Sequence, residues 1–146
     1  MTQESDTGRR SETLALAARF VAALEAGDFD TMRDCYAPDA VIWHNTDGLQ
    51  SPGQDREANI RVLAWMRRQL KTYRYDVQRR EVTSDGFFQQ HVLRGETHLG
   101  EILALAAVVI CRVSEGRITR LDEYLREADA EVLVRAAAAA RSNAGA

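Results

Sequence analysis

The chain has 146 residues, which fits one domain, and its apolar fraction of 45% is ordinary for a globular protein. The formal net charge is −3 and the basic residues are scattered, which argues against nucleic acid as a partner because phosphate binding needs a concentrated positive face. No stretch is apolar for long enough to span a membrane, and Lys71, the only lysine, gives little basis for Schiff-base chemistry.

The N-terminus and the cysteines indicate where the protein resides. Residues 1–10 are polar and lack the apolar core of a signal peptide, so we expect a disordered leader and a cytoplasmic protein. Cys35 and Cys111 lie far apart and form no CxxC motif. We expect two buried thiols in a reducing compartment, with a disulfide between them as the unsupported alternative.

Apolar residues at helical spacing predict three helices in the first half of the chain. The first spans residues 11–27, begins at the capping residue Ser11 and ends at Gly27. Asp28 caps a short second helix that Pro38 ends. A β-branched and aromatic strand follows at residues 40–45, and Asp55 then caps a third helix that runs to about residue 71.

From Tyr73 onward the apolar period changes to two, which predicts four antiparallel strands. Asp85 and Gly86 form a hairpin turn before a strand at residues 87–98. The strand at residues 103–113 is almost wholly apolar, so we expect it to be covered on both faces. The last strand spans residues 117–126, and Asp129 can cap a terminal helix.

This order of elements predicts an α+β, cone-shaped two-layer fold in which three N-terminal helices lid a curved antiparallel, partly mixed sheet. Such a sheet encloses a hollow between itself and the helices. We expect a pocket domain at residues 11–128 and a C-terminal helical tail at residues 129–146.

Four segments carry a family resemblance. Residues 19–28 (RFVAALEAGD) and 35–45 (CYAPDAVIWHN) resemble the opening of the nuclear transport factor two superfamily, in its ketosteroid-isomerase-like and SnoaL-like polyketide-cyclase branches. Residues 94–101 (RGETHLGE) and 116–125 (GRITRLDEYL) are similar to the GTHxGE and GxIxxxxEY segments of SnoaL-like proteins. The resemblance covers residues 11–129 and implies the cone-shaped fold, but the superfamily holds both enzymes and binding domains.

The resemblance to ketosteroid isomerases implies that this chain does not isomerise ketosteroids. The tyrosine of their oxyanion hole falls on Phe20, which has no hydroxyl, and their protonated aspartate falls near Val109. Only their base falls on a polar residue, His44.

At the positions that the resemblance to limonene-epoxide hydrolases assigns to catalysis, this chain has mostly polar residues, but of different types. Four of the five catalytic positions of those enzymes hold ionisable residues here, and one holds an aliphatic residue. The asparagine falls on His44, the tyrosine on Ile42, the Arg-x-Asp pair on Glu96 and His98, and the last aspartate on Glu123.

The resemblance implies the candidate catalytic residues, and strand parity supports their inward direction. We expect His44, His98 and Glu123 to converge in the hollow, with histidine as general base and the carboxylate orienting it. His91 lies seven residues before His98, on the opposite face of a regular strand, so we expect it at the surface or in an interface. A bulge at Gly95 would exchange the two histidines.

A second group of side chains is expected to bind the substrate. The alternative for them is ordinary packing and, for Glu96, an ion pair with an arginine. These residues are Phe20, Ile42, Trp65, Met66, Phe88 and Glu96. The three histidines show no metal-ligand spacing, and no phosphate loop or dinucleotide fingerprint is present. We therefore expect no metal and no organic cofactor.

Three functions fit these features. The first is a cofactor-independent enzyme, an isomerase, cyclase, hydratase or hydrolase, that acts on a small apolar compound bearing a carbonyl or an epoxide. The second is a binding or accessory domain with the same pocket and no chemistry. The third is a structural dimerisation module with a filled interior. We also expect a homodimer, because a curved sheet has an outer face that a second copy can cover.

Overall fold

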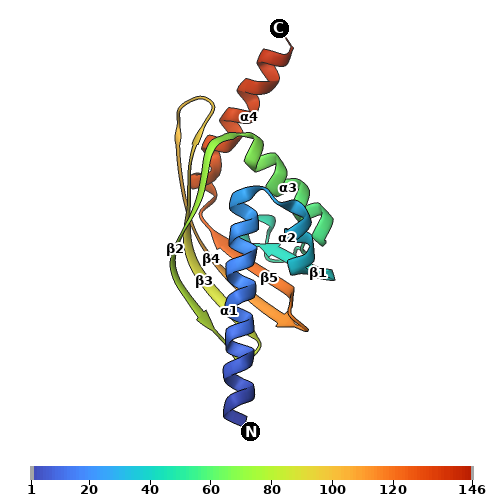
Figure 1. The fold of residues 1–146 in the computed structure, drawn as a ribbon. Helices are drawn as coiled ribbons and strands as arrows, with labels where there is room; N and C mark the ends of the chain where they lie inside the picture. The colour runs from blue at the N-terminus through green and yellow to red at the C-terminus, as the bar shows by residue number, and fades with distance from the viewer. Residues whose placement is uncertain (1, 146) are drawn as a thin grey trace.

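The computed structural model describes residues 2–145, and Met1 and Ala146 lie outside the described part (Figure 1). The elements in chain order are α1 (Thr2–Ala26), α2 (Phe29–Cys35), β1 (Tyr36–His44), the 3-10 turn η1 (Asn45–Asp47), α3 (Arg56–Arg68), β2 (Leu70–Val82), β3 (Gly86–Thr97), β4 (Ile102–Ser114), β5 (Arg117–Leu125), the 3-10 turn η2 (Glu127–Ala130) and α4 (Glu131–Ala144). Within residues 2–145, no helix is both long and apolar enough to cross a membrane.

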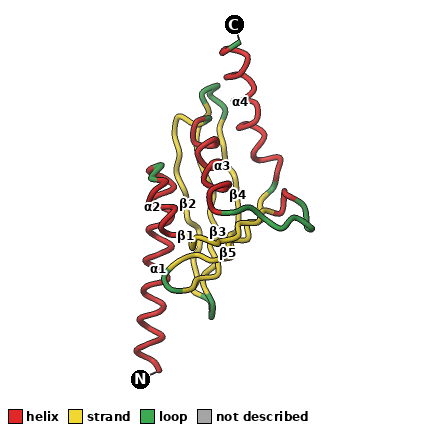
Figure 2. The backbone as a smooth tube through the Cα atoms, turned by 90° about the vertical axis from the view of Figure 1, so that its right-hand side faces the viewer, coloured by secondary structure: helices red, strands yellow, loops and turns green. Residues whose placement is uncertain are grey.

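The five strands form one mixed sheet in the order β1-β5-β4-β3-β2. Strands β2 to β5 are an antiparallel meander, and β1 pairs with β5 in parallel. Helices α1, α2 and α3 pack against one face, here called the inner face, and the opposite face is called the outer face. The sheet is curved and the two chain ends lie at opposite ends of the molecule (Figures 1 and 2). The predicted α+β fold with a lidded, partly mixed sheet is confirmed.

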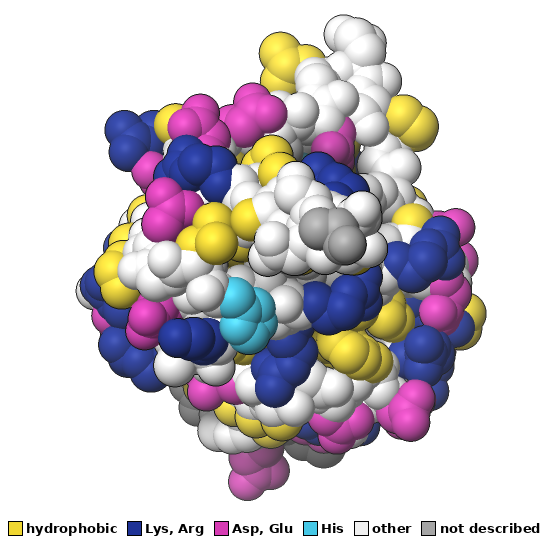
Figure 3. Space-filling model, turned by 90° about the horizontal axis from the view of Figure 1, so that it is seen from above, with side chains coloured by type: hydrophobic (Ala, Val, Ile, Leu, Met, Phe, Trp, Pro, Cys, Tyr) yellow, Lys and Arg dark blue, Asp and Glu magenta, His cyan; other side chains and the backbone are white. Residues whose placement is uncertain are grey.

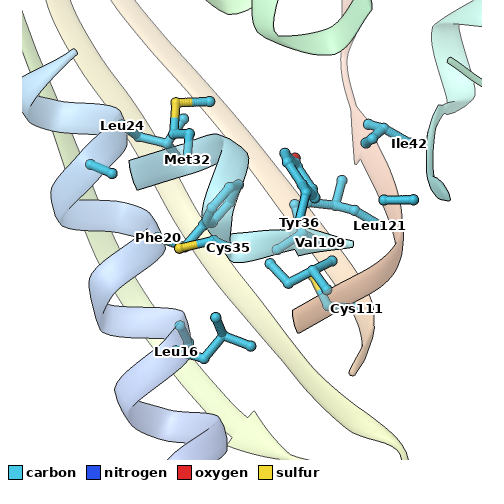
Figure 4. Packing of buried hydrophobic residues seen from close by; sticks show 14 of the residues in the cluster. Leu16, Phe20, Leu24, Met32, Cys35, Tyr36, Ile42, Val109, Cys111 and Leu121 are labelled. Atoms are coloured by element: carbon cyan, nitrogen blue, oxygen red, sulfur yellow. The ribbon is translucent and has the colours of Figure 1, made fainter. Parts of the chain in front are cut away.

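The core fills the space between α1, α2 and the inner face of the sheet (Figure 4). Leu16, Phe20 and Leu24 are spaced four apart on α1, so they lie on one face of the helix and point into this core, where Met32 and Cys35 of α2 lie beside them. Both cysteines are free and lie in this core, as predicted, and burial raises the pKa of each thiol. Apolar packing therefore holds the helical layer on the sheet.

Two expectations differ from the structure at its edges. Residues 2–10 continue α1 instead of forming a disordered leader, and Arg9 bonds this extension to the chain by donating to the carbonyl of Thr83, 3.1 Å away. Strand β4 alternates between buried and exposed residues instead of being covered on both faces, since only its inner face meets helices. Its outer face exposes Ile102 and Ile110.

Seen from above, the molecule mixes basic and acidic side chains, with apolar atoms between them (Figure 3). This view shows no concentration of one charge sign, in keeping with the scattered basic residues of the sequence.

The end of α1 depends on a glycine and on an arginine from α3. Gly27 has a φ of +67°, a left-handed conformation that favours glycine, and follows the last helical residue. Arg67 donates to the carbonyl of Glu25 at 2.8 Å, and a Cβ at Gly27 would lie 2.4 Å from its Nε. The guanidinium thus satisfies a free carbonyl at the helix end and joins α1 to α3.

We predict that Gly27→Ala lowers the free energy of unfolding by about 1–2 kcal/mol, because an alanine is strained in this conformation and displaces Arg67. Gly8→Ala is the matched control, since Gly8 lies inside α1 and a Cβ added there would have no neighbouring atom within 4 Å. The control is expected to leave stability unchanged or raise it by up to about 1 kcal/mol. Urea titrations measure both; equal effects would contradict the role of Gly27.

Candidate functional site

A cavity opens between the inner face of the sheet, α3 and α4. Its volume is about 500 Å³, within the range of small-molecule sites. A recess of about 50 Å³ lies deeper, toward α1, and shares several lining residues with the cavity. The walls are mostly apolar, and the ionisable and polar side chains that line both spaces are His44, Asn59, Tyr75, His91 and Glu123.

The parallel pairing of β1 with β5 brings His44 and Glu123 together. The two residues are direct Cα partners across the strands, so their side chains leave the same face of the sheet. Nε2 of His44 lies 3.6 Å from Oε2 of Glu123. Strand parity predicted this proximity, because His44 follows Ile42 and Glu123 follows Leu121 at a spacing of two.

An amide beyond the strand end fixes this pairing. Asn45 donates from Nδ2 to the carbonyl of Leu125 and accepts from the amide N–H of the same residue, both at 3.0 Å. These two bonds imitate one more step of strand pairing directly after His44 and Glu123. The Cα positions of the pair are therefore held on both sides.

Asp47 orients the imidazole of His44. Its Oδ2 lies 3.3 Å from Nδ1, within the turn η1. An ionised carboxylate only accepts hydrogen bonds, so Nδ1 carries a proton. In the neutral imidazole, Nε2 then has the lone pair, on the side of Glu123. Nε2 is thus the basic atom of the site.

Burial controls the charge of Glu123. Loss of solvation raises the pKa of its carboxyl, and the nearby charge of His44 opposes this increase. The carboxyl therefore keeps a proton to a higher pH than an exposed glutamate does. A carboxyl with a raised pKa and an imidazole nitrogen then face each other within the same cavity.

The opposite wall of the cavity carries hydrogen-bonding aromatic rings. The ring of His91 packs edge-on against Tyr75, with 5.1 Å between centroids, and the hydroxyls of Tyr75 and Tyr73 are 3.1 Å apart. Burial raises the pKa of Tyr75 well above its ordinary value and that of Tyr73 to about 12, so both phenols are neutral. This wall can donate hydrogen bonds to a ligand.

His98 does not lie in the cavity, and the prediction that it does is wrong. Strand β3 ends at Thr97, whose amide donates to the carbonyl of Glu101 at 2.9 Å and closes a turn around the exposed His98. Gly100 adopts a φ of +84° in this turn. His91 takes the inward place, so the expectation of a surface histidine at that position is also wrong.

The same parity error affects two predicted substrate-binding residues. The inward residues of β3 are the odd-numbered ones, such as Phe87 and Gln89, which are buried. Phe88 points outward beneath the guanidinium of Arg79, and Glu96 lies on the outer face beside a surface hollow. Neither side chain lines the cavity.

The other predicted lining residues fall into two groups. Trp65 and Met66 of α3 line the cavity, and Phe20 of α1 lines the recess. Ile42 is completely buried and bonds through its main chain to Gln54, so it is a core residue, not a wall residue. Inward strand parity alone does not distinguish the core from the cavity.

Sequence reasoning did not identify several polar residues of the site. Asp47 follows His44 by three residues, a spacing that a turn converts into contact. Oε1 of Gln54 is buried at the cavity wall and has no hydrogen-bond partner among residues 2–145, and Asn59 accepts from the hydroxyl of Tyr36 at 3.1 Å. One sequence pattern could have identified the inward face of β3, namely the alternating residues Phe87, Gln89, His91 and Leu93. Residues 2–145 contain no group of three or more His, Cys, Asp or Glu side chains suited to a metal ion.

Comparisons with known proteins agree with this architecture. The model of the SnoaL-like domain family matches residues 17–121, most of the chain. IdmH from Streptomyces antibioticus, a proposed polyketide cyclase, is 24% identical with a TM-score of 0.72, covering 84% of this chain and 97% of that chain.

Two further solved structures share the fold at lower identity. A limonene-epoxide-hydrolase-like (LEH-like) epoxide hydrolase from M. tuberculosis is 18% identical with a TM-score of 0.69, covering 92% of this chain and 98% of that chain. PrhC from Penicillium brasilianum is 12% identical with a TM-score of 0.76, covering 90% and 91%. A search of curated proteins finds no match. On its family match and its fold, the chain belongs to the SnoaL-like domain family of the nuclear transport factor two superfamily.

Proposed function

We propose that this chain is a cofactor-independent acid–base enzyme that acts on a small, mostly apolar compound with a carbonyl or epoxide oxygen. The observation that carries the proposal is the pair formed by His44 and Glu123, 3.6 Å apart at the wall of a cavity of about 500 Å³. Burying two ionisable side chains in an apolar cavity costs folding free energy, and such arrangements are typical of functional sites. This favours a chemical role for the pair.

The pair can both accept and donate a proton. Nε2 of His44 takes a proton from a substrate C–H or from water, while the protonated carboxyl of Glu123 supplies one to the developing product. The next turnover begins after the proton returns from the imidazolium to the carboxylate across the 3.6 Å gap. The cycle balances without an external oxidant or reductant, as isomerisation, aldol-type cyclisation, hydration and hydrolysis require.

The cavity walls limit the substrate. Trp65, Met66 and Leu105 provide apolar surface, and the unpartnered Oε1 of Gln54 can accept a hydrogen bond from a ligand hydroxyl or N–H. Polyketide-, terpenoid- or steroid-like metabolites combine such surfaces with a few oxygen atoms. The polyketide cyclase and epoxide hydrolase names of the structural neighbours fit the same class of chemistry.

We also propose that the protein is a homodimer formed through the outer face of the sheet. Ile102, Ile110 and Tyr124 are 70%, 47% and 48% exposed there. The ion pairs Arg94–Asp76 and Arg120–Asp122 provide both charge signs around these apolar side chains. A face that carries both signs is complementary to a copy of itself, which a twofold dimer requires.

We predict that His44→Ala reduces kcat by a factor of about 10²–10⁴, the usual contribution of a general base. The assay is turnover of a panel of polyketides, terpenoid epoxides and unsaturated ketones. His98→Ala is the matched control, because His98 is exposed and outside the cavity. Unchanged activity in His44→Ala would remove the proposed base, and ligand-induced thermal stabilisation without any turnover would favour a binding domain.

We predict that Glu123→Gln stabilises the fold at neutral pH while it abolishes activity. Because burial raises the pKa of Glu123, its folded state loses stability as the pH rises above the ordinary value of 4.5. The variant therefore gains on the order of 1 kcal/mol near pH 7, and the gain vanishes near pH 4, where folded and unfolded carboxyls are both protonated. Urea titrations at the two pH values test this, with Glu12→Gln on the exposed side of α1 as the control.

We predict that Ile110→Arg converts a dimer into a monomer at micromolar concentration, because it places two like charges in an apolar interface. Leu49→Arg, in a loop where the side chain is 82% exposed, is the control and leaves the dimer intact. Sedimentation velocity measures the masses. A monomeric wild-type protein would contradict the proposed homodimer.

A further inference from the structure

A chain of hydrogen bonds leads from a half-buried arginine to the cavity. Arg80 donates from Nε and from a terminal nitrogen to the same oxygen, Oε1 of Gln89, at 2.8 and 2.6 Å. Nε2 of Gln89 lies 3.0 Å from Nδ1 of His91. His91 lines both the cavity and the recess, so the chain connects the interior of the sheet with the site.

The chemistry of these three side chains determines where the protons lie. A guanidinium only donates, so the amide of Gln89 turns its oxygen toward Arg80 and its NH₂ group toward His91. An NH₂ group only donates, so Nδ1 of His91 is the acceptor and carries no proton. The ring proton is therefore on Nε2, since the hydrogen bond of the ring within residues 2–145 is made at Nδ1.

We propose that Arg80 and Gln89 hold His91 as a neutral Nε2–H donor that binds a carbonyl oxygen of the substrate and stabilises the negative charge that develops on it. This proposal rests on the proposed acid–base function and deepens it, because it names an enolisable carbonyl compound as the substrate class. A neutral imidazole that donates to a carbonyl oxygen is an established electrophilic catalyst.

A β-bulge places Arg80 where the chain of hydrogen bonds needs it. The register between β2 and β3 shifts between Val77 and Arg79, so that Arg80, not Arg79, is the Cα partner of Gln89 on the inner face. No carboxylate pairs with Arg80 in the part of the chain that the structure describes. Arg80 is half-buried, and both of its side-chain hydrogen bonds go to the neutral amide of Gln89, which fixes the orientation of that amide.

Arg80 and burial also keep His91 neutral. Loss of solvation and the positive charge of Arg80 lower the pKa of the imidazole to about 4. The other ionisable groups that line the cavity or the recess are Tyr36, Tyr75, His44, Asp47, Glu123, Glu127 and Glu131. The donor is therefore a neutral N–H at neutral pH.

The sheet separates the donor from the acid–base pair by one strand. Val109 of β4 lies between Gln89 and Glu123, and Ala107 lies between His91 and Leu125 in the next row. Strands two positions apart are about 10 Å apart, so a small molecule fits between the two walls. Transfer of an α-proton to His44 moves an electron pair onto the carbonyl oxygen, where Nε2–H of His91 stabilises the enolate until Glu123 returns a proton to carbon.

The first test measures the proton position by NMR of the histidine ring nitrogens. Wild-type protein at neutral pH is expected to show His91 with a protonated Nε2 and an unprotonated Nδ1. Gln89→Glu replaces the amide donor by a carboxylate acceptor and is expected to protonate Nδ1. Gln90→Glu adds the same charge on the exposed outer face at the next position and is expected to leave His91 unchanged. A proton on Nδ1 of the wild type, or equal effects of the two variants, would overturn the proposal.

The second test measures binding of 2-naphthol, whose oxygen resembles that of an enol. His91→Phe keeps an aromatic ring and removes the donor, and we expect binding weaker by a factor of up to about ten, as for the loss of a hydrogen bond to a neutral oxygen. His98→Phe is the control and is expected to bind like the wild type. Equal affinities of the two variants would refute the donor role. Neither readout needs turnover, so a failure of the proposed acid–base function leaves these results interpretable.

Discussion

Two hydrogen bonds between the side chain of Asn45 and the main chain of Leu125 extend the parallel pairing of β1 and β5 beyond the last residue of β1. Everything proposed for the site depends on this pairing, because it sets His44 beside Glu123. The strands come from distant parts of the chain, and no hairpin fixes their register. The side-chain amide of Asn45 therefore constrains the register of two strands that no short loop connects. Asp47 then orients the imidazole of His44.

The polar groups of the cavity are divided between two walls. The wall of β1 and β5 carries the acid–base pair, and the wall of β2 and β3 carries His91 and the neutral tyrosines. Strand β4 lies between them with small or apolar residues on its inner face. This separation leaves room for a ligand that contacts both walls at once. It also lets burial act on each polar group separately, raising the pKa of Glu123 and lowering that of His91.

The helices close the space that the sheet leaves open. Leu133 of α4 packs with Leu93 and Leu105 at one end of the sheet, and an ion pair of 3.0 Å joins Arg135 to Glu101. At the other end, α1 and α2 fill the concave face with apolar side chains. The cavity lies between these two packed regions, where its mostly apolar walls carry a few polar side chains such as His44, His91 and Glu123.

The sequence alone determined the order of elements, the α+β class, the inward faces of β1 and β5 and hence the meeting of His44 with Glu123. These follow from local periodicity and capping. In a regular strand successive side chains point to opposite faces, so the direction of one residue determines the direction of the next. Sequence reasoning failed at β3, where the family resemblance, on a strand expected to reach residue 98, assigned His98 instead of His91 to the cavity. The strand in fact ends at Thr97, and the turn that follows leaves His98 exposed. Only the tertiary structure decided which inward residues line a cavity and which, like Ile42, fill the core. It alone placed Arg80 opposite Gln89, because a register shift between two strands depends on their pairing and leaves no mark in either strand's own pattern.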